Sequence, residues 1–313
     1  MAMESAGNIP RCPSQTSPVY LHGYDFGGII VAAMTDLPLD LPVISLTALT
    51  LPEGWEQAVV ACWERGVAIP TEYDKPGDPP SRDVTLCLAV AEPFAEPRIH
   101  RAMPGGIYDL EVYTQEVCDG IHDHWIDPAA GKWQYTYHER MTAYRVPGGA
   151  EPVDQLEYVV ATLAAASESR RAQATLWKPW EDGQTDHPAC LQRLWFRLRG
   201  DRLVMSAHMR SNDAYKAAFM NMYAFTELQA TIARRLAERT GRPIVPGQYN
   251  HIADSFHIYG SYFEDFRGFL ESLKARTFEQ RTYRTEQMAP LFEEAREKIR
   301  AALGRETRDA GRA

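Results

Sequence analysis

The chain has 313 residues, of which 45% are hydrophobic, with 33 lysines and arginines against 42 aspartates and glutamates. This length and hydrophobic content predict a packed globular protein with a sizeable core. The net charge of -9 argues against broad binding of nucleic acid or of anionic membranes. An anionic ligand must therefore meet a local basic pocket.

The cysteines suggest a reducing environment. The five of them are odd in number, widely spaced and without a C-x-x-C pair. That pattern predicts neither a disulfide framework nor a zinc site, so no metal and a cytoplasmic setting are expected. The N-terminus shows no basic segment followed by an apolar one, and the apolar run at 27–34 is too short to span a bilayer. No targeting or membrane segment is expected.

Both ends of the chain are polar. Residues 1–18 are rich in turn formers and residues 304–313 are charged, so each end is expected to be flexible. One folded domain would then occupy residues 19–303. Within it, a strand is predicted at 84–90, and apolar residues at helical spacing predict a helix at 154–166.

An alternating pattern predicts a hairpin further along. Apolar and polar residues alternate over 194–198, Gly200 permits a turn, and the alternation resumes at 203–207. A helix is predicted at 219–238, and residues 251–259 would place several polar side chains on one strand face. Strands and helices without a regular βαβ rhythm predict an α+β domain in which helices flank a mixed sheet.

Cys190 stands at the entrance to the predicted hairpin. A thiol becomes a useful nucleophile only when nearby cations stabilise its thiolate. Arg170 and Arg171 precede it, and Arg210 and Ser211 follow the hairpin. Arginine forks suit a phosphate, and a serine hydroxyl adds a donor. A free cysteine is equally typical of a small buried hydrophobic residue, and arginines in sequence are equally typical of a solvated surface. On these residues alone, the catalytic and the structural interpretation both stay open.

Three motifs resemble, in order and spacing, those of the thymidylate synthase superfamily. They are S-R-R ending at Arg171, P-x-C-x-Q around Cys190 and R-S-x-D ending at Asp213, with Asn221 eight residues beyond the aspartate. The resemblance covers roughly residues 80–265. It implies a layered fold of that type, a homodimer through the sheet, and transfer of a one-carbon unit from 5,10-methylenetetrahydrofolate to C5 of a pyrimidine nucleotide.

The resemblance also implies roles for individual residues. Cys190 would add to C6 of the pyrimidine, Asp213 would hold the pterin of the folate, and Asn221 would contact the edge of the base. The other implied contacts are to the phosphate from Arg210, Ser211 and Arg82, to the phosphate across the dimer interface from the partner's Arg170 and Arg171, and to the ribose from His257 and Tyr259.

The same chemistry requires a carboxylate that organises water and moves protons. The family places a glutamate for this purpose on a helix before the segment that begins at Tyr135. Glu111 and Glu116 are both candidates. The segment 108–120 departs from the usual family sequence, so the choice between them stays open.

The base, the sugar and the product are less constrained. The carboxamide of Asn221 offers a donor and an acceptor, so it suits uracil or, turned over, cytosine. Other family members end in a short apolar tail that closes over the folate, whereas this chain continues with a helix-like segment at 285–303 and a charged end. A site that admits water favours hydration of an exocyclic methylene over hydride transfer.

Within the superfamily, the chain most resembles the CMP hydroxymethylases of nucleoside-antibiotic (mildiomycin) biosynthesis, and this resemblance implies a ribonucleotide substrate. We expect a hydroxymethyltransferase that converts CMP to 5-hydroxymethyl-CMP. Hydroxymethylation of dCMP and methylation of dUMP are alternatives with the same active site. A catalytically silent nucleotide-binding relative is an alternative of another class.

Overall fold

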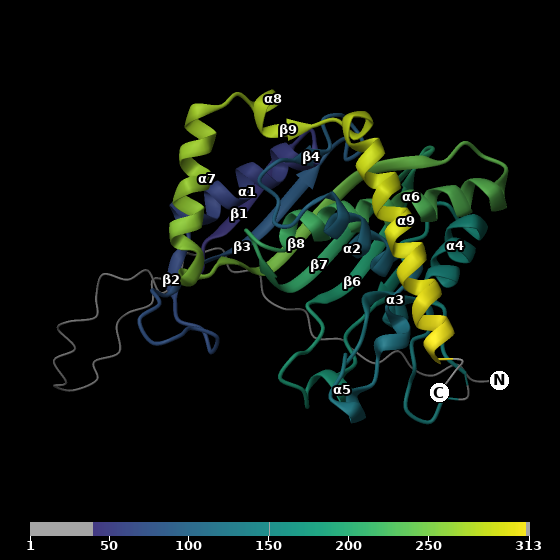
Figure 1. Ribbon diagram of the computed structural model, residues 1–313. Helices are drawn as coiled ribbons and strands as arrows, with labels where there is room; N and C mark the ends of the chain where they lie inside the picture. Colours follow the sequence, from purple (N-terminus) through teal and green to yellow (C-terminus); the bar gives the residue numbers. More distant parts are fainter. Residues whose placement is uncertain (1–39, 150, 311–313) are drawn as a thin grey trace, which may run out of the picture. The chain divides into compact units, whose positions relative to one another are not determined.

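A seven-stranded mixed sheet forms the centre of the computed structural model, which describes residues 40–149 and 151–310 (Figure 1). Its strands follow the order β1-β3-β8-β7-β6-β5, and β2 pairs with β3. The pairs β1/β3 and β7/β8 are parallel, and the other pairs are antiparallel. A second, two-stranded sheet joins β4 to β9. The strands are β1 (Val43–Ala48), β2 (Val67–Ile69), β3 (Ser81–Val90), β4 (Ile99–His100), β5 (Gln173–Thr175), β6 (Leu191–Arg199), β7 (Arg202–Asp213), β8 (Val245–Ile258) and β9 (Thr282–Tyr283).

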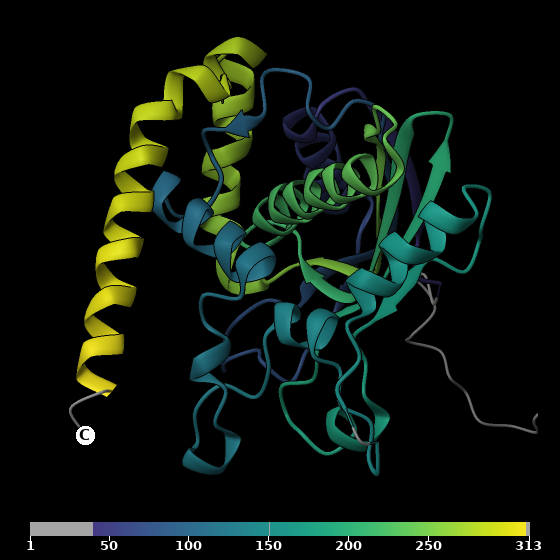
Figure 2. The same cartoon turned by 90° about the vertical axis from the view of Figure 1, so that its right-hand side faces the viewer.

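Helices pack in successive layers on one side of this sheet. Figure 2 shows α6 beside the strands, α2 beside α6, and α9 outermost. The helices are α1 (Leu51–Arg65), α2 (Ile107–Asp119), α3 (Tyr137–Thr142), α4 (Gln155–Ala165), α5 (Pro179–Asp182), α6 (Ala218–Thr240), α7 (Phe263–Ala275), α8 (Phe278–Arg281) and α9 (Thr285–Ala310), with short 3-10 turns at Asp123–Trp125, Pro128–Ala130 and Gly260–Tyr262.

The core lies between the sheet and helices α1 and α6. Trp55 of α1 is fully buried, and its indole N–H donates to the carbonyl of Ala214 beyond β7 at 2.9 Å. Phe219 of α6 packs edge-on against that indole, with ring centroids 5.5 Å apart. Burying large aromatic rings supplies much of the hydrophobic stabilisation of such a core. These contacts anchor the end of β7 and the start of α6, the two segments that carry Asp213 and Asn221.

The other face of the sheet carries polar and exposed side chains. Val43 of β1 is 65% exposed there. His208 of β7 and Asp254 of β8 approach each other at 2.9 Å and are both partly exposed. A sheet needs apolar cover on only one face to form a core, so this second face remains available for another surface.

The predicted layered α+β class is confirmed, and so are its main elements. The helix expected at 154–166 is α4, which Asp154 caps through a hydrogen bond to the N–H of Glu157. The expected hairpin is β6/β7, and Gly200 takes a φ of 60° at its turn, where a side chain would be strained. The helix expected at 219–238 is α6.

Of the two predicted domain limits, only the C-terminal one falls among the described residues. Helix α9 runs to Ala310, so residues 304–310, expected from the sequence to be a flexible tail, are helical. The predicted boundary between residues 18 and 19 lies outside the described residues.

Candidate active site

Cys190 lies immediately before β6, beside Arg210 of the neighbouring strand β7. The guanidinium Nη2 of Arg210 is 3.7 Å from the Cys190 Sγ. The same guanidinium donates to the carbonyls of Pro188 at 2.8 Å and Ala189 at 3.1 Å, which holds it against the loop that precedes the cysteine. Burial raises the pKa of the Cys190 thiol, and the Arg210 charge opposes that rise. The cation therefore stands where it can stabilise a thiolate.

The hairpin explains how residues 20 positions apart in the sequence meet. The backbone N–H of Arg210 donates to the carbonyl of Cys190 at 2.9 Å, which continues the antiparallel β6/β7 ladder beyond its last paired strand residues. The register is determined by the tight turn at Gly200 and by the buried faces of the two strands. The proximity of Cys190 and Arg210 that the sequence predicts is therefore confirmed as a direct contact.

Three tyrosines lie in the neighbourhood of Cys190. The hydroxyl of Tyr137 accepts a hydrogen bond from the N–H of Leu191 at 3.3 Å. Tyr135 contacts the backbone N–H of Cys190, and burial raises the pKa of Tyr135 to about 12. Tyr113 of α2 is close enough for the Cys190 charge to affect its pKa, which burial raises far more strongly. Sequence reasoning assigned these tyrosines no role, because no local spacing connects them to Cys190.

Asp213 is the last residue of β7 and lies at the same end of the β6/β7 pair as Cys190. Its Oδ1 accepts hydrogen bonds from the N–H groups of Tyr215 at 3.0 Å and Lys216 at 2.8 Å. Burial raises the pKa of the Asp213 carboxyl to about 6, although these two hydrogen bonds and the Lys216 charge act in the opposite direction. Both described hydrogen bonds go to Oδ1, which leaves Oδ2 to accept one from a ligand.

Asn221 lies in the first turn of α6 and is only 6% exposed. Its Oδ1 accepts a hydrogen bond from the side-chain amide of Asn212 at 2.9 Å, and its Nδ2 donates to the hydroxyl of Tyr113. Asn212 is the residue between Ser211 and Asp213 in the R-S-x-D motif. Sequence reasoning treated that position as variable and therefore missed it.

The polar face predicted for residues 251–259 divides into two groups. His251 contacts Tyr249 and Asn212, each at 2.8 Å. The hydroxyl of Ser255 lies 3.1 Å from Nδ1 of His257 and donates to Asp83 of β3 at 2.7 Å.

The two predicted ribose residues come together at the end of β8. The ring of Tyr259, just beyond the strand, packs edge-on against His257 with centroids 4.6 Å apart. Burial lowers the pKa of His257 to about 4, so the imidazole is neutral at pH 7.

The two candidate glutamates point to different surroundings. Glu111 is buried and forms an ion pair with Arg296 of α9, at 2.8 Å. Glu116 instead lies 2.8 Å from His122, and its charge affects the pKa of Tyr113 beside Cys190. Burial raises the pKa of Glu116 and the contact with His122 lowers it, with burial the larger effect.

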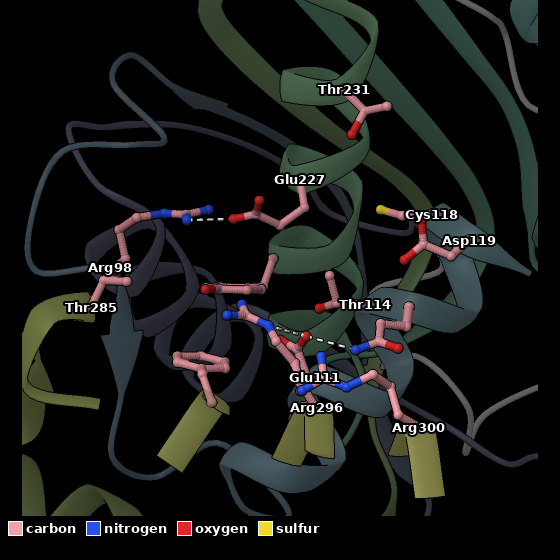
Figure 3. A pocket seen from close by; sticks show the side chains of 13 residues that line it. Arg98, Glu111, Thr114, Cys118, Asp119, Glu227, Thr231, Thr285, Arg296 and Arg300 are labelled. Carbon is pink, nitrogen blue, oxygen red and sulfur yellow. Dashed lines mark hydrogen bonds and ion pairs between the residues drawn. The ribbon is translucent and has the colours of Figure 1, made fainter. Parts of the chain in front are cut away.

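Glu111 lines a cavity of about 560 Å³ between α2, α6 and α9. Figure 3 shows its carboxylate directed at Arg296, and Arg98 directed at Glu227, to which it is bonded at 2.6 Å. The lining includes Cys118 but not Cys190. The structure therefore places Glu111 in this cavity, whose lining does not include Cys190, and Glu116 beside His122.

The phosphate candidates are only partly gathered. Ser211 stands next to Arg210 on β7. Arg82 of β3 donates to the carbonyl of Gly66 at 2.8 Å, and no contact with Arg210 or Ser211 is described for it. Arg170 and Arg171 are exposed, and their guanidinium groups make no hydrogen bond or ion pair with the described part of the chain. Within one protomer these two arginines are not brought to Cys190.

The described residues contain neither a metal-binding cluster nor a membrane-spanning helix. In residues 40–149 and 151–310, no group of three or more His, Cys, Asp or Glu side chains is arranged to hold a metal ion. Among the same residues, none of the helices combines the length and the apolar character needed to cross a membrane.

The chain is similar in sequence to known proteins of one family. The thymidylate synthase family profile matches residues 109–300. The "putative thymidylate synthase" of Methanosarcina acetivorans is 25% identical over 214 residues, which cover 68% of this chain and 88% of that protein. The protein of the same description from Methanocaldococcus jannaschii is 29% identical over 167 residues, covering 52% of this chain and 68% of that protein.

The solved structures agree on the fold. The thermostable thymidylate synthase A of Bacillus subtilis superposes with a TM-score of 0.53 at 18% identity, covering 71% of this chain and 84% of that one. The profile match extends over more than half of the chain and includes Cys190, Asp213 and Asn221. The chain therefore belongs to the thymidylate synthase family.

Proposed function

We propose that this protein hydroxymethylates C5 of a pyrimidine nucleotide, with CMP as the substrate and methylenetetrahydrofolate as the co-substrate that the family uses. The observation that carries the proposal is the 3.7 Å approach of the Arg210 guanidinium to the Cys190 thiol. The strand that supplies this cation ends at Asp213, and Asn212 links it to Asn221. The proposed nucleophile, anion-binding group and base-reading amide are thus linked at one end of the β6/β7 pair.

The chemistry follows from the electronic structure of the pyrimidine. C5 is a poor nucleophile, but addition of the Cys190 thiolate at C6 turns it into an enolate-like carbon. Bound methylenetetrahydrofolate supplies the one-carbon unit that C5 takes up. Loss of the C5 proton and release of tetrahydrofolate, by cleavage of its bond to the transferred carbon, leave an exocyclic methylene on the nucleotide. Water adds to this methylene, and expulsion of Cys190 restores the ring. The net change in the nucleotide is a gain of CH2O.

The described residues fit both ligands. Oδ2 of Asp213 is available to a pterin N–H, because the two backbone hydrogen bonds occupy Oδ1. Arg210 and Ser211 would hold the phosphate, and His257 and Tyr259 would contact the ribose. The neutral imidazole of His257 can accept as well as donate a hydrogen bond, as a hydroxyl partner requires.

A homodimer would complete the phosphate site. Arg170 and Arg171 have exposed guanidinium groups without a described partner, on the chain that enters β5 beside β6. The carbonyl of Arg170 accepts a hydrogen bond from the indole of Trp195 on β6 at 3.0 Å, which ties this segment to the edge of the sheet. We propose that two copies pair through the open face of the sheet, and that each donates these arginines to the site of the other.

The position of α9 supports hydroxymethylation over methylation. Its Phe292 stacks on Tyr223 of α6, with centroids 6.4 Å apart, and its Arg296 is paired with Glu111 of α2. This segment is therefore held as a helix against α2 and α6 and does not fold over Cys190 as an apolar tail. A site that admits water at the methylene stage yields the hydroxymethyl product.

A mass-resolved assay tests the proposal. The purified protein is incubated with methylenetetrahydrofolate and, separately, with CMP, dCMP, UMP and dUMP. A gain of CH2O on CMP supports it. A gain of CH2 on dUMP with formation of dihydrofolate would show thymidylate synthesis instead. A gain of CH2O on dCMP would show hydroxymethylation of the deoxyribonucleotide. If none of the four nucleotides gives a product or releases tritium from C5, the protein is a catalytically silent nucleotide-binding relative.

A further inference from the structure

Five polar side chains form a hydrogen-bonded chain behind the base-reading amide. It begins at Tyr249 of β8, whose hydroxyl lies 2.8 Å from Nδ1 of His251. Nε2 of His251 lies 2.8 Å from Oδ1 of Asn212, and Nδ2 of Asn212 donates to Oδ1 of Asn221 at 2.9 Å. Nδ2 of Asn221 then donates to the hydroxyl of Tyr113 on α2. The chain connects β8, β7, α6 and α2.

Burial makes this arrangement obligatory. Tyr249 and His251 are fully buried, Asn212 is 3% exposed and Asn221 is 6% exposed. Buried polar groups are almost always paired, since an unpaired donor retains the full cost of leaving water. His251 is held neutral by its burial, so its ring carries a single N–H.

The donors and acceptors can run in only one favourable order. Oδ1 of Asn212 can only accept, so the proton of His251 is on Nε2, and Nδ1 must then accept from the hydroxyl of Tyr249. His251 is the hydrogen-bond partner described for that hydroxyl. In the reverse order the fully buried O–H of Tyr249 would lose its acceptor. In the observed order the spare O–H belongs to half-buried Tyr113 instead.

We propose that Tyr249, His251 and Asn212 are positioning residues that lock the Asn221 amide in one orientation and so make it select one base. The proposal rests on the function proposed above. Uracil presents an N3–H donor and an O4 acceptor, whereas cytosine presents an N3 acceptor and an amino donor. An amide free to flip serves both bases equally, and a locked amide serves one. The buried chain therefore gives an otherwise ambidextrous asparagine a preference for one base, which on the function proposed above is cytosine.

Substitution of Asn212 gives the sharpest test. In Asn212→Asp the carboxylate can still accept from His251 but can no longer donate to Asn221. The Asn221 amide is then expected to turn its Nδ2 toward residue 212 and its oxygen toward the O–H of Tyr113. Tyr249→Phe removes the first donor of the chain without touching the nucleotide site. Tyr223→Phe is the matched control, because it deletes a hydroxyl that is also buried, at 4% exposure, but outside the chain.

The measurement is the dissociation constant of the full-length protein for CMP and for UMP, by titration calorimetry at pH 8. We expect the wild type to favour CMP by at least about tenfold, Asn212→Asp to favour UMP, Tyr249→Phe to reduce the preference about tenfold, and Tyr223→Phe to keep it. Equal weakening of both nucleotides, with the ratio unchanged in Asn212→Asp, would show a structural role only and overturn the inference.

The remaining outcomes separate the two proposals. A wild type that favours UMP, with Asn212→Asp shifted toward CMP, supports the locking chain and refutes the cytosine assignment. A wild type that binds neither nucleotide refutes both. If Asn212→Asp does not fold, an unchanged ratio in Tyr249→Phe overturns the inference by itself.

Discussion

Glu111 and Arg296 form an ion pair, with 2.8 Å between the carboxylate and Nε, that joins α2 to the C-terminal helix α9. Five positions further along α2, Glu116 is paired with His122, and its charge contributes to the raised pKa of Tyr113. Positions five apart on a helix lie on different faces, so the two carboxylates do not both face the same neighbouring group.

Substitution of the two glutamates should therefore give opposite results. We expect Glu116→Gln to lower the rate of C5-tritium release about a hundredfold, because a proton-handling carboxylate is lost. Glu111→Gln should leave that rate within about twofold and lower the free energy of unfolding by about 1 kcal/mol, since Arg296 is partly exposed. Tritium release and urea unfolding of both variants measure this. A larger rate loss in Glu111→Gln would reverse the assignment.

Cys190 is expected to be the nucleophile. Cys190→Ala should reduce C5-tritium release by at least about a thousandfold while CMP binding persists, because exchange of the C5 proton requires the covalent bond at C6. Cys87→Ala, a half-buried thiol on β3, is the matched control and should retain the wild-type rate. Full activity in Cys190→Ala would exclude a covalent mechanism through this residue.

The pH dependence of exchange should reflect the buried thiol. Burial raises the pKa of Cys190 above its ordinary value, so the thiolate fraction is small at neutral pH and grows as the pH rises. We expect C5-tritium release at subsaturating nucleotide to keep increasing up to at least pH 9. A plateau reached below pH 8 would contradict this, because it would mean that the pKa of Cys190 is not raised when the nucleotide phosphate is bound beside Arg210.

Asp213 should make the protein less stable as its carboxyl ionises. Its folded-state pKa of about 6 lies above the unfolded value of 3.8, so the folded state binds the proton more tightly. Stability from this group is present below pH 4 and is lost as the pH rises to 6, by on the order of 2–3 kcal/mol. Asp213→Asn should thus unfold at higher urea than the wild type at pH 7.5 but not at pH 4. Equal midpoints at pH 7.5 would contradict this.

Shared sites predict complementation between inactive variants. A chain with both Arg170→Gln and Arg171→Gln, and a chain with Cys190→Ala, should each be inactive alone. After mixing and subunit exchange, half of the dimers are mixed and hold one intact site, so about a quarter of the wild-type activity should return. Activity that stays absent, with mixed dimers demonstrated by differential tagging, would place both phosphate arginines in the same subunit as Cys190.

The sequence by itself determined the local elements and the proximity of Cys190 to Arg210. Alternation and Gly200 predicted the hairpin, helical spacing predicted α4 and α6, and the motif spacing predicted Cys190 next to Arg210. Each of these rests on contacts between residues close in the chain, or on a register that a tight turn determines.

Only the tertiary structure decided the rest. The pairing of Glu111 with Arg296 depends on where α9 packs, and the contact of Tyr113 with Asn221 joins two helices that no local pattern connects. The chain from Tyr249 to Asn221 is held by burial, which obliges each polar group to find a partner. Such partners are set by the packing of distant segments, and the sequence pattern around each residue carries no record of them.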